Sequence, residues 1–185
     1  MRLFIGVRIP DEIKERLSDI SRKLKSKVRE ARIVSPENLH ITLKFIGETA
    51  EGKIPKLTEI ITKSLENNAP FTAKVEGAGV FPDERNARVF WIGVNTQGNL
   101  KKLSAAIETA LAREGISKEE KRFKEHITIA RFKSPPKNAF LKELLEKHEE
   151  EVFGEMDVKE VELIKSDLGR SGSSYTTVFK IPLRI

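Results

Sequence analysis

Two spacings of apolar residues occur along the chain, and each predicts a different kind of element. Short apolar stretches predict strands, whereas apolar residues at every third or fourth position predict helices. On this basis we expect helices at residues 11–29, 53–67, 100–113 and 139–149. We expect strands at residues 3–9, 39–46, 71–81, 88–95, 125–132, 152–165 and 175–184, with a glycine- and serine-rich turn at 166–174.

Two tetrapeptides recur about half a chain length after their first copies. The sequence Phe4-Ile5-Gly6-Val7 has a counterpart in Trp91-Ile92-Gly93-Val94. The sequence His40-Ile41-Thr42-Leu43 has a counterpart in His126-Ile127-Thr128-Ile129. The predicted elements recur in the same order, and this agreement makes a chance match the weaker explanation.

The recurrence predicts a single duplicated domain over residues 1–185, with approximate repeats 1–86 and 87–185. A duplication predicts two similar lobes related by a pseudo-twofold axis, so that each motif faces its counterpart across a cleft. Neither half ends in a stretch typical of a linker, and we therefore expect one cooperative unit.

The composition excludes several classes of protein. The 185 residues include no cysteine, which excludes a disulfide framework, a thiolate zinc site and a cysteine nucleophile. No stretch of about 18 apolar residues occurs, and the N-terminal apolar stretch is too short for a signal peptide. We therefore expect a soluble, cytoplasmic protein that makes no membrane contact. We also expect a monomer, although the sequence itself carries no signal of oligomeric state.

The charge of the chain favours an anionic partner. Lysine and arginine number 34 against 28 aspartate and glutamate residues, which gives a net charge of +6. Nucleic acid is one partner that suits such a balance. Ion-pair networks on the surface of a heat-adapted protein explain the same composition equally well. The charge alone therefore does not identify RNA.

The two His-Ile-Thr sequences place a histidine and a threonine side chain on one face of each predicted strand. In a strand, residues i and i+2 point to the same side. His40 and Thr42 therefore share a face, and His126 and Thr128 share the equivalent face of the second strand. Each strand offers one imidazole and one hydroxyl group to the same space.

Such a set of side chains suits acid–base chemistry on a phosphate. Near pH 7 a neutral imidazole accepts a proton and an imidazolium donates one. With a histidine on each side of a phosphorus atom, one activates the nucleophile and the other protonates the leaving oxygen. The threonine hydroxyls can donate hydrogen bonds to the non-bridging oxygens. Two histidines are too few for a metal site, so we expect no metal and no cofactor.

The structural alternative is that both histidines are polar members of half-exposed strands. Their duplication on equivalent strands favours the functional interpretation. The third histidine, His148, lies in Lys147-His148-Glu149-Glu150 at the end of a predicted helix. We predict that it lies on the solvated surface.

Three segments resemble one family. The residues from Pro36 to Glu48 are similar to the first motif of the 2H phosphoesterases, in the branch of the RNA 2′,3′-cyclic phosphodiesterases and 2′-5′ RNA ligases. His126-Ile127-Thr128-Ile129-Ala130-Arg131 resembles the second motif. Ser166-Asp167-Leu168 and Gly172-Ser173-Ser174-Tyr175 resemble the C-terminal pattern. Glu125 departs from the family, which often has proline there, and an acidic neighbour would raise the pKa of His126 if it lay close.

The resemblance implies a bilobal α+β fold, with two mainly antiparallel sheets flanked by helices and a central cleft. It implies hydrolysis of RNA 2′,3′-cyclic phosphate ends to 2′-phosphates, with tRNA fragments among the candidate substrates. Some members also join such an end to a 5′-hydroxyl without ATP, which is reasonable because the strained ring holds the energy. By similarity, His40 is the acid toward the departing 3′ oxygen and His126 is the base on water.

Three further residues are candidates for substrate binding. Arg131 resembles a phosphate contact of the family, but strict alternation would turn it away from His126, so a bulge or strand end must re-aim it. Lys44 shares the parity of His40 and could attract phosphate. Tyr175 could stack on a base or simply begin a strand. The same alternation places Phe45 in the apolar core.

Other functions remain open at this point. An enzyme of the same superfamily could act on small nucleotide or ADP-ribose cyclic phosphates. A non-catalytic RNA-binding module could carry the histidines without using them. A histidine-based metal site is a third alternative, and undiminished turnover in excess chelator would exclude it.

Overall fold

The computed structural model describes residues 1–120, 122–137, 139–169 and 172–185. Within these residues the α-helices are α1 (Asp11–Lys27), α2 (Ile54–Ser64), α3 (Asn99–Ala112) and α4 (Phe140–His148). The strands are β1 (Arg2–Arg8), β2 (Ala31–Ile33), β3 (His40–Glu48), β4 (Phe71–Phe81), β5 (Val89–Asn95), β6 (His126–Phe132), β7 (Val152–Val158), β8 (Glu160–Gly169) and β9 (Gly172–Pro182). Short 3-10 turns, η1 (Pro36–Asn38) and η2 (Glu51–Lys53), precede β3 and α2.

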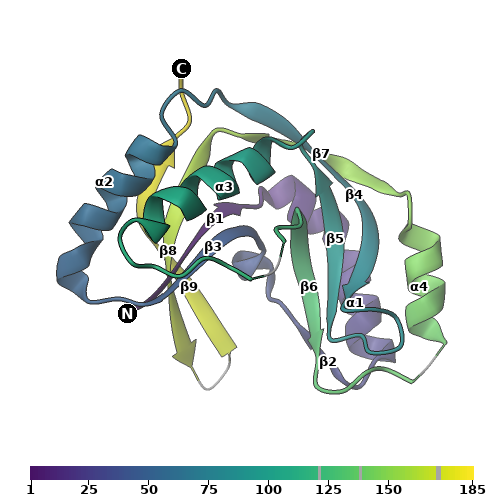
Figure 1. The fold of residues 1–185 in the computed structure, drawn as a ribbon. Helices are drawn as coiled ribbons and strands as arrows, with labels where there is room; N and C mark the ends of the chain where they lie inside the picture. Colours follow the sequence, from purple (N-terminus) through teal and green to yellow (C-terminus); the bar gives the residue numbers. More distant parts are fainter. Residues whose placement is uncertain (121, 138, 170–171) are drawn as a thin grey trace.

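The strands form two antiparallel sheets (Figure 1). The first has the order β3-β1-β8-β9, and the second has the order β2-β6-β5-β4-β7. In each sheet the strand that begins with a histidine lies next to the strand that carries the other repeated tetrapeptide. Each sheet also takes strands from both halves of the chain, because β8 pairs with β1 and β4 pairs with β5. The predicted α+β class with two antiparallel sheets is confirmed, whereas the duplication itself stays a prediction.

The helices cover the two sheets on their apolar faces. Helices α2 and α3 pack on the first sheet, and α1 and α4 pack on the second (Figure 1). Helix α1 shows how the sequence specifies this packing, since its buried residues Ile13, Leu17, Ile20 and Leu24 recur at helical spacing. One continuous apolar cluster runs through both sheets and joins the two halves. No helix in the described part of the chain is long and apolar enough to cross a membrane.

Two predicted segments differ from the structure. The strand expected at 152–165 is two strands, because β7 ends at Val158 in the second sheet and β8 begins at Glu160 in the first. The turn expected at 166–174 is mostly strand, since β8 extends to Gly169 and β9 begins at Gly172. Residues 170–171, in the middle of that turn, lie outside the described residues. The short strand β2 was not predicted.

The prediction for His148 is wrong. The residue is 4% exposed and packs against the ring of Phe153 at the end of α4. Its Nδ1 is hydrogen-bonded to the carboxylate of Glu151. The charged neighbours in the sequence indicated a solvated position, but α4 turns this one position toward the core.

Candidate active site

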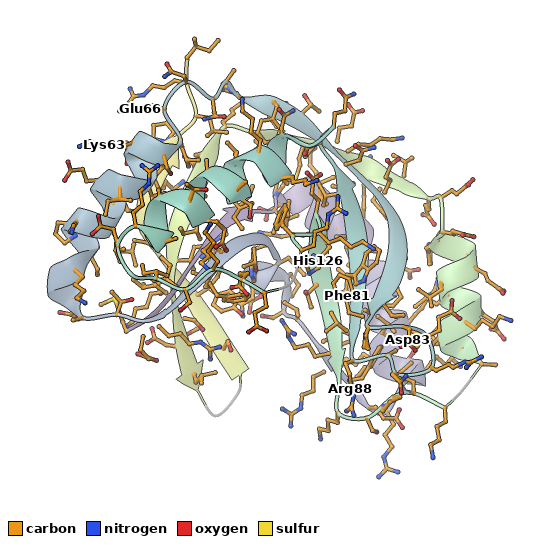
Figure 2. The ribbon with its side chains drawn as sticks, viewed as in Figure 1. Lys63, Glu66, Phe81, Asp83, Arg88 and His126 are labelled. Atoms are coloured by element: carbon orange, nitrogen blue, oxygen red, sulfur yellow. The ribbon has the colours of Figure 1, made fainter. Side chains whose placement is uncertain are left out.

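The two histidine-bearing strands belong to different sheets but lie against each other. Strand β3 begins with His40, and β6 begins with His126. The charge of His126 is the smallest of the named influences that lower the pKa of His40. Folding therefore brings together two residues that are about half a chain apart. Figure 2 shows His126 on the second sheet, beside Phe81.

His40 is oriented by hydrogen bonds at both ring nitrogens. Its Nδ1 lies 2.7 Å from the carbonyl oxygen of Asn38, and its Nε2 lies 2.9 Å from the hydroxyl oxygen of Thr42. A carbonyl oxygen can only accept, so in the neutral ring Nδ1 carries the proton and Nε2 accepts from Thr42. The rings of Phe4 and Tyr175 lie 4.7 and 5.1 Å from the imidazole, centre to centre. These contacts fix the ring and limit its access to water.

His126 has an equivalent environment. Its Nδ1 donates to the carbonyl oxygen of Lys124 at 2.7 Å, two residues earlier in the chain, as in the first motif. The rings of Phe81 and Trp91 lie 5.0 and 6.4 Å away, and the ammonium group of Lys124 lies 4.0 Å from the indole centre. A Cβ atom on Gly79 would lie 2.1 Å from Trp91, so glycine is needed there for the indole to lie against β4.

Both imidazoles are held in the neutral form. Burial lowers the pKa of His40 to about 4; the hydrogen bond to the carbonyl oxygen of Asn38 opposes this shift, and the charges of Arg8, Arg131 and His126 add to it. Burial also lowers the pKa of His126, with smaller contributions from Arg131 and Lys124. Near pH 7 each ring therefore carries its proton on Nδ1 and presents Nε2 as an acceptor.

The low pKa of His40 predicts an acid-sensitive fold. The ordinary pKa of histidine is about 6.5, so between pH 6.5 and 4 the unfolded chain binds a proton that the folded chain does not. The free energy of unfolding should then fall over this range, by at most about 3 kcal/mol from His40. Urea unfolding at pH 7 and pH 4.5 measures the loss. His40→Asn keeps a donor for the carbonyl of Asn38 and should lose less stability on acidification than the wild type; an equal loss would contradict the assignment.

A β-bulge in each histidine-bearing strand changes which residues face the site. In β3 the pairing with β1 skips Leu43, and in β6 the pairing with β5 skips Ile129. Each extra residue lies three positions after its histidine, and each reverses the alternation that follows. Arg131 is consequently exposed on the face of His126 and acts on the pKa of both histidines. The bulge required to re-aim Arg131 is therefore present.

The bulge in β3 overturns the parity predicted for Lys44 and Phe45. Lys44 is 3% exposed, donates to the carbonyl oxygen of Ser117 at 2.6 Å, and forms an ion pair with Glu108 at 2.9 Å. It points toward α3, away from the face of His40. Phe45 takes the position equivalent to Arg131: it is 48% exposed, and its ring lies 6.0 Å from Phe4.

Arg8 is a further candidate for the site that the sequence interpretation missed. It lies opposite His40 in the pairing of β1 with β3. Its guanidinium group donates to the carbonyl oxygens of Glu37 at 3.0 Å and Tyr175 at 3.2 Å, and to the carboxylate of Glu162 at 3.4 Å. Alternation along β1 could have revealed it, because Phe4, Gly6 and Arg8 share one face. Tyr175 lies within β9 rather than at its start.

Glu125 does not act on His126. Its carboxylate accepts hydrogen bonds from the backbone and hydroxyl of Thr96 and from the backbone N–H of Lys101, at the start of α3. The pKa of His126 is lowered, not raised. Glu125 thus ties the second motif to the positive end of α3. Among the described residues, no group of three His, Cys, Asp or Glu side chains is placed to hold a metal ion.

Comparison with known proteins assigns the family. A model described as the 2′-5′ RNA ligase superfamily matches residues 9–170, which include both histidine motifs. The chain belongs to this superfamily. The predicted resemblance to the 2H phosphoesterases is therefore confirmed.

Relatives of the superfamily match the chain over nearly its whole length. An RNA 2′,3′-cyclic phosphodiesterase of Archaeoglobus fulgidus is 38% identical over 175 residues, which cover 95% of this chain and 96% of the relative. One of Aquifex aeolicus is 36% identical over 180 residues, covering 96% and 95%. Among solved structures, a protein of Thermus thermophilus has a TM-score of 0.83 at 31% identity, covering 100% of this chain and 98% of that one. E. coli LigT complexed with 3′-AMP has a TM-score of 0.75 at 26% identity, covering 98% and 97%.

Proposed function

We propose that this chain hydrolyses 2′,3′-cyclic phosphate ends of RNA to 2′-phosphates without a metal or cofactor. The observation that carries the proposal is the matched pair of imidazoles. Each is fixed through Nδ1 to the carbonyl oxygen two residues earlier, and each begins one of two strands, β3 and β6, that lie against each other. Relatives named RNA 2′,3′-cyclic phosphodiesterase support the substrate class.

The proposed reaction uses one imidazole at each end of an in-line displacement. His126 takes a proton from water as its oxygen attacks phosphorus, and His40 gives a proton to the 3′ oxygen as the P–O3′ bond breaks. The hydroxyls of Thr42 and Thr128 and the guanidinium of Arg131 stabilise the charge on the non-bridging oxygens. When an RNA 5′-hydroxyl replaces water as the nucleophile, the same groups join two RNA ends: His126 takes the proton of the hydroxyl, a P–O5′ bond forms, and the 3′ oxygen leaves with a proton from His40.

His40 must gain its proton together with the substrate. Its pKa of about 4 in the empty site leaves it neutral near pH 7. An anionic phosphate beside the ring offsets the positive charges of Arg8 and Arg131, and so raises the pKa of His40. Tyr175, whose ring packs edge-on against His40, is then placed near the bound nucleoside. Lys44 has no role in this proposal because its ammonium group is buried against Glu108.

Proton uptake on binding tests this electrostatic account. Binding of a nucleoside 2′-phosphate, the product class, should take up protons at pH 7, because the ligand raises the pKa of the histidines. Titration calorimetry in two buffers that differ in ionisation enthalpy measures the number taken up. His40→Asn should take up fewer protons than the wild type. Binding without proton exchange would contradict the proposed protonation of the site.

The activity itself is tested with an RNA oligomer that ends in a 2′,3′-cyclic phosphate. In excess chelator we expect conversion to the 2′-phosphate, identified by mass spectrometry and resistance to a 3′-phosphatase. The matched control is the double variant His40→Ala/His126→Ala. Loss of turnover in chelator would indicate a metal site, and turnover confined to mononucleotides would favour the small-nucleotide alternative. Fragments of tRNA with cyclic ends are the substrates that we propose to compare first. We also propose that a monomer is the active species, because one chain supplies both histidines.

A further inference from the structure

We propose that Arg32, which lies beside Arg131 on the neighbouring strand, binds the phosphodiester group that precedes the terminal cyclic phosphate of the RNA, while Arg131 contacts the terminal phosphate. This inference rests on the proposed function and adds a second phosphate site to it. It concerns a residue of β2, the short strand at the edge of the second sheet. It also explains why an RNA chain would be preferred to a mononucleotide.

Arg32 and Arg131 face the same side of the sheet. They are direct partners in the antiparallel pairing of β2 with β6, and directly opposite residues project to one face. Ala31 and Ile33, on either side of Arg32, pack against the core, while Arg32 is exposed. The bulge at Ile129 places Arg131 on the face of His126, so Arg32 extends that face outward.

The two guanidinium groups form an uncompensated positive pair. Like charges directly opposite each other on a sheet repel, and an anion bound between them would offset this repulsion. Within the described residues the side chain of neither Arg32 nor Arg131 forms a hydrogen bond or an ion pair. By contrast, Arg8 on the other side of His40 is paired with Glu162. Arginine forks match the oxygens of a phosphodiester, which makes this group the ligand that fits the pair.

The position of Arg32 separates its role from that of Arg131. Arg131 acts on the pKa of both histidines, whereas Arg32 is not among the charges that set either one. We infer that Arg131 contacts the reacting phosphate, and that Arg32, on the edge strand β2 beyond β6, lies one strand farther from it. A ligand that reaches both must carry a second phosphate, as an RNA chain does.

The opposite direction is unfavourable for a phosphate chain. Beyond Arg8 a cavity of about 820 Å³ opens between β1, β7 and β8. Its lining includes carboxylate groups in excess over cations, from Glu12, Glu155, Asp157, Glu160 and Glu162. Asp157, Glu160 and Glu162 are paired with Lys159, Lys180 and Arg8, but the lining keeps a net negative charge, which favours the path over Arg131 and Arg32 for the RNA backbone.

A pair of substrates isolates this contact. A mononucleoside 2′,3′-cyclic phosphate has no second phosphate, and a dinucleotide with the same end adds one phosphodiester. For Arg32→Gln, the ratio of kcat/KM for the dinucleotide to that for the mononucleotide should fall about tenfold, through KM. The slope of log(kcat/KM) against log[salt] for the dinucleotide should decrease by about one. Arg32→Lys should recover part of the ratio.

Arg22→Gln is the matched control, because Arg22 lies on α1, which covers the other face of the second sheet. It removes the same charge and should leave the ratio at the wild-type value. An unchanged ratio in Arg32→Gln, or the same fall in both variants, would overturn the proposal. Failure of the proposed function is separately visible, since wild-type protein would then turn over neither substrate. In that case the preference is measured by binding, as the ratio of the Kd for the mononucleoside 2′-phosphate to the Kd for the dinucleotide 2′-phosphate. Arg32→Gln must still lower this ratio.

Discussion

Replacing His40 or His126 with alanine should lower kcat for cyclic phosphate hydrolysis by about 10³- to 10⁴-fold. The size reflects the loss of a positioned general acid or base, and the double variant should be little worse than either single one because the two groups act as a unit. Single-turnover measurements on an RNA oligomer with a cyclic end give the rate. Thermal unfolding checks that each variant is folded.

His148→Gln is the control for these variants. His148 is buried at the end of α4 and bonded to Glu151, so its replacement should lower stability but leave kcat close to the wild-type value. The pH–rate profile of the wild type should be bell-shaped, since one imidazole must be charged and the other neutral. A variant of His40 or His126 that kept a near wild-type rate would refute acid–base catalysis by the pair.

Removing one threonine hydroxyl should have the second largest effect. Thr42→Ala and Thr128→Ala should each lower kcat about 10- to 1000-fold, as expected for the loss of one donor to the transition state. Thr42→Ser and Thr128→Ser keep the hydroxyl and should recover most of the rate. The loss should appear in kcat more than in KM. An alanine variant as active as its serine counterpart would show that the hydroxyl does not contribute.

The Thr42 variant should differ from the Thr128 variant in one respect. The Thr42 hydroxyl donates to Nε2 of His40 in the empty site, so its removal also frees the imidazole. Thr42→Ala should therefore shift the limb of the pH–rate profile that reports the pKa of His40. Under the proposed mechanism Thr128 acts on the substrate alone, so its alanine variant should keep this limb in place.

The sequence predicted the elements and the histidine faces because these depend on local periodicity. The alternation of side chains between the two faces of a strand holds before each bulge, at His40, Thr42, His126 and Thr128. Residues after the bulges could be assigned only by assuming the register. The assumption of strict alternation is wrong for Lys44, which is buried against α3. For Arg131 the sequence itself indicates a bulge, because strict alternation would turn its side chain away from His126.

Long-range pairing also limited the prediction. Nothing local in residues 152–165 marks Lys159 as the point where the chain passes from one sheet to the other. Strand β2 has three residues and is stabilised by its pairing with β6, so its own sequence gives little signal. Arg8 was missed for a related reason, because its role depends on β3, η1 and β9 meeting around its side chain.

The exchange of strands between the halves bears on how such a chain could arise. Strand β4 completes the sheet that holds His126, and β8 completes the sheet that holds His40. If a half-length ancestor existed, its sheet would have had an unpaired edge strand, and two copies would have paired by exchanging strands, as in domain swapping. The two imidazoles would then have met at the axis of a homodimer, one from each subunit, and fusion of the genes would have made that intersubunit pair permanent.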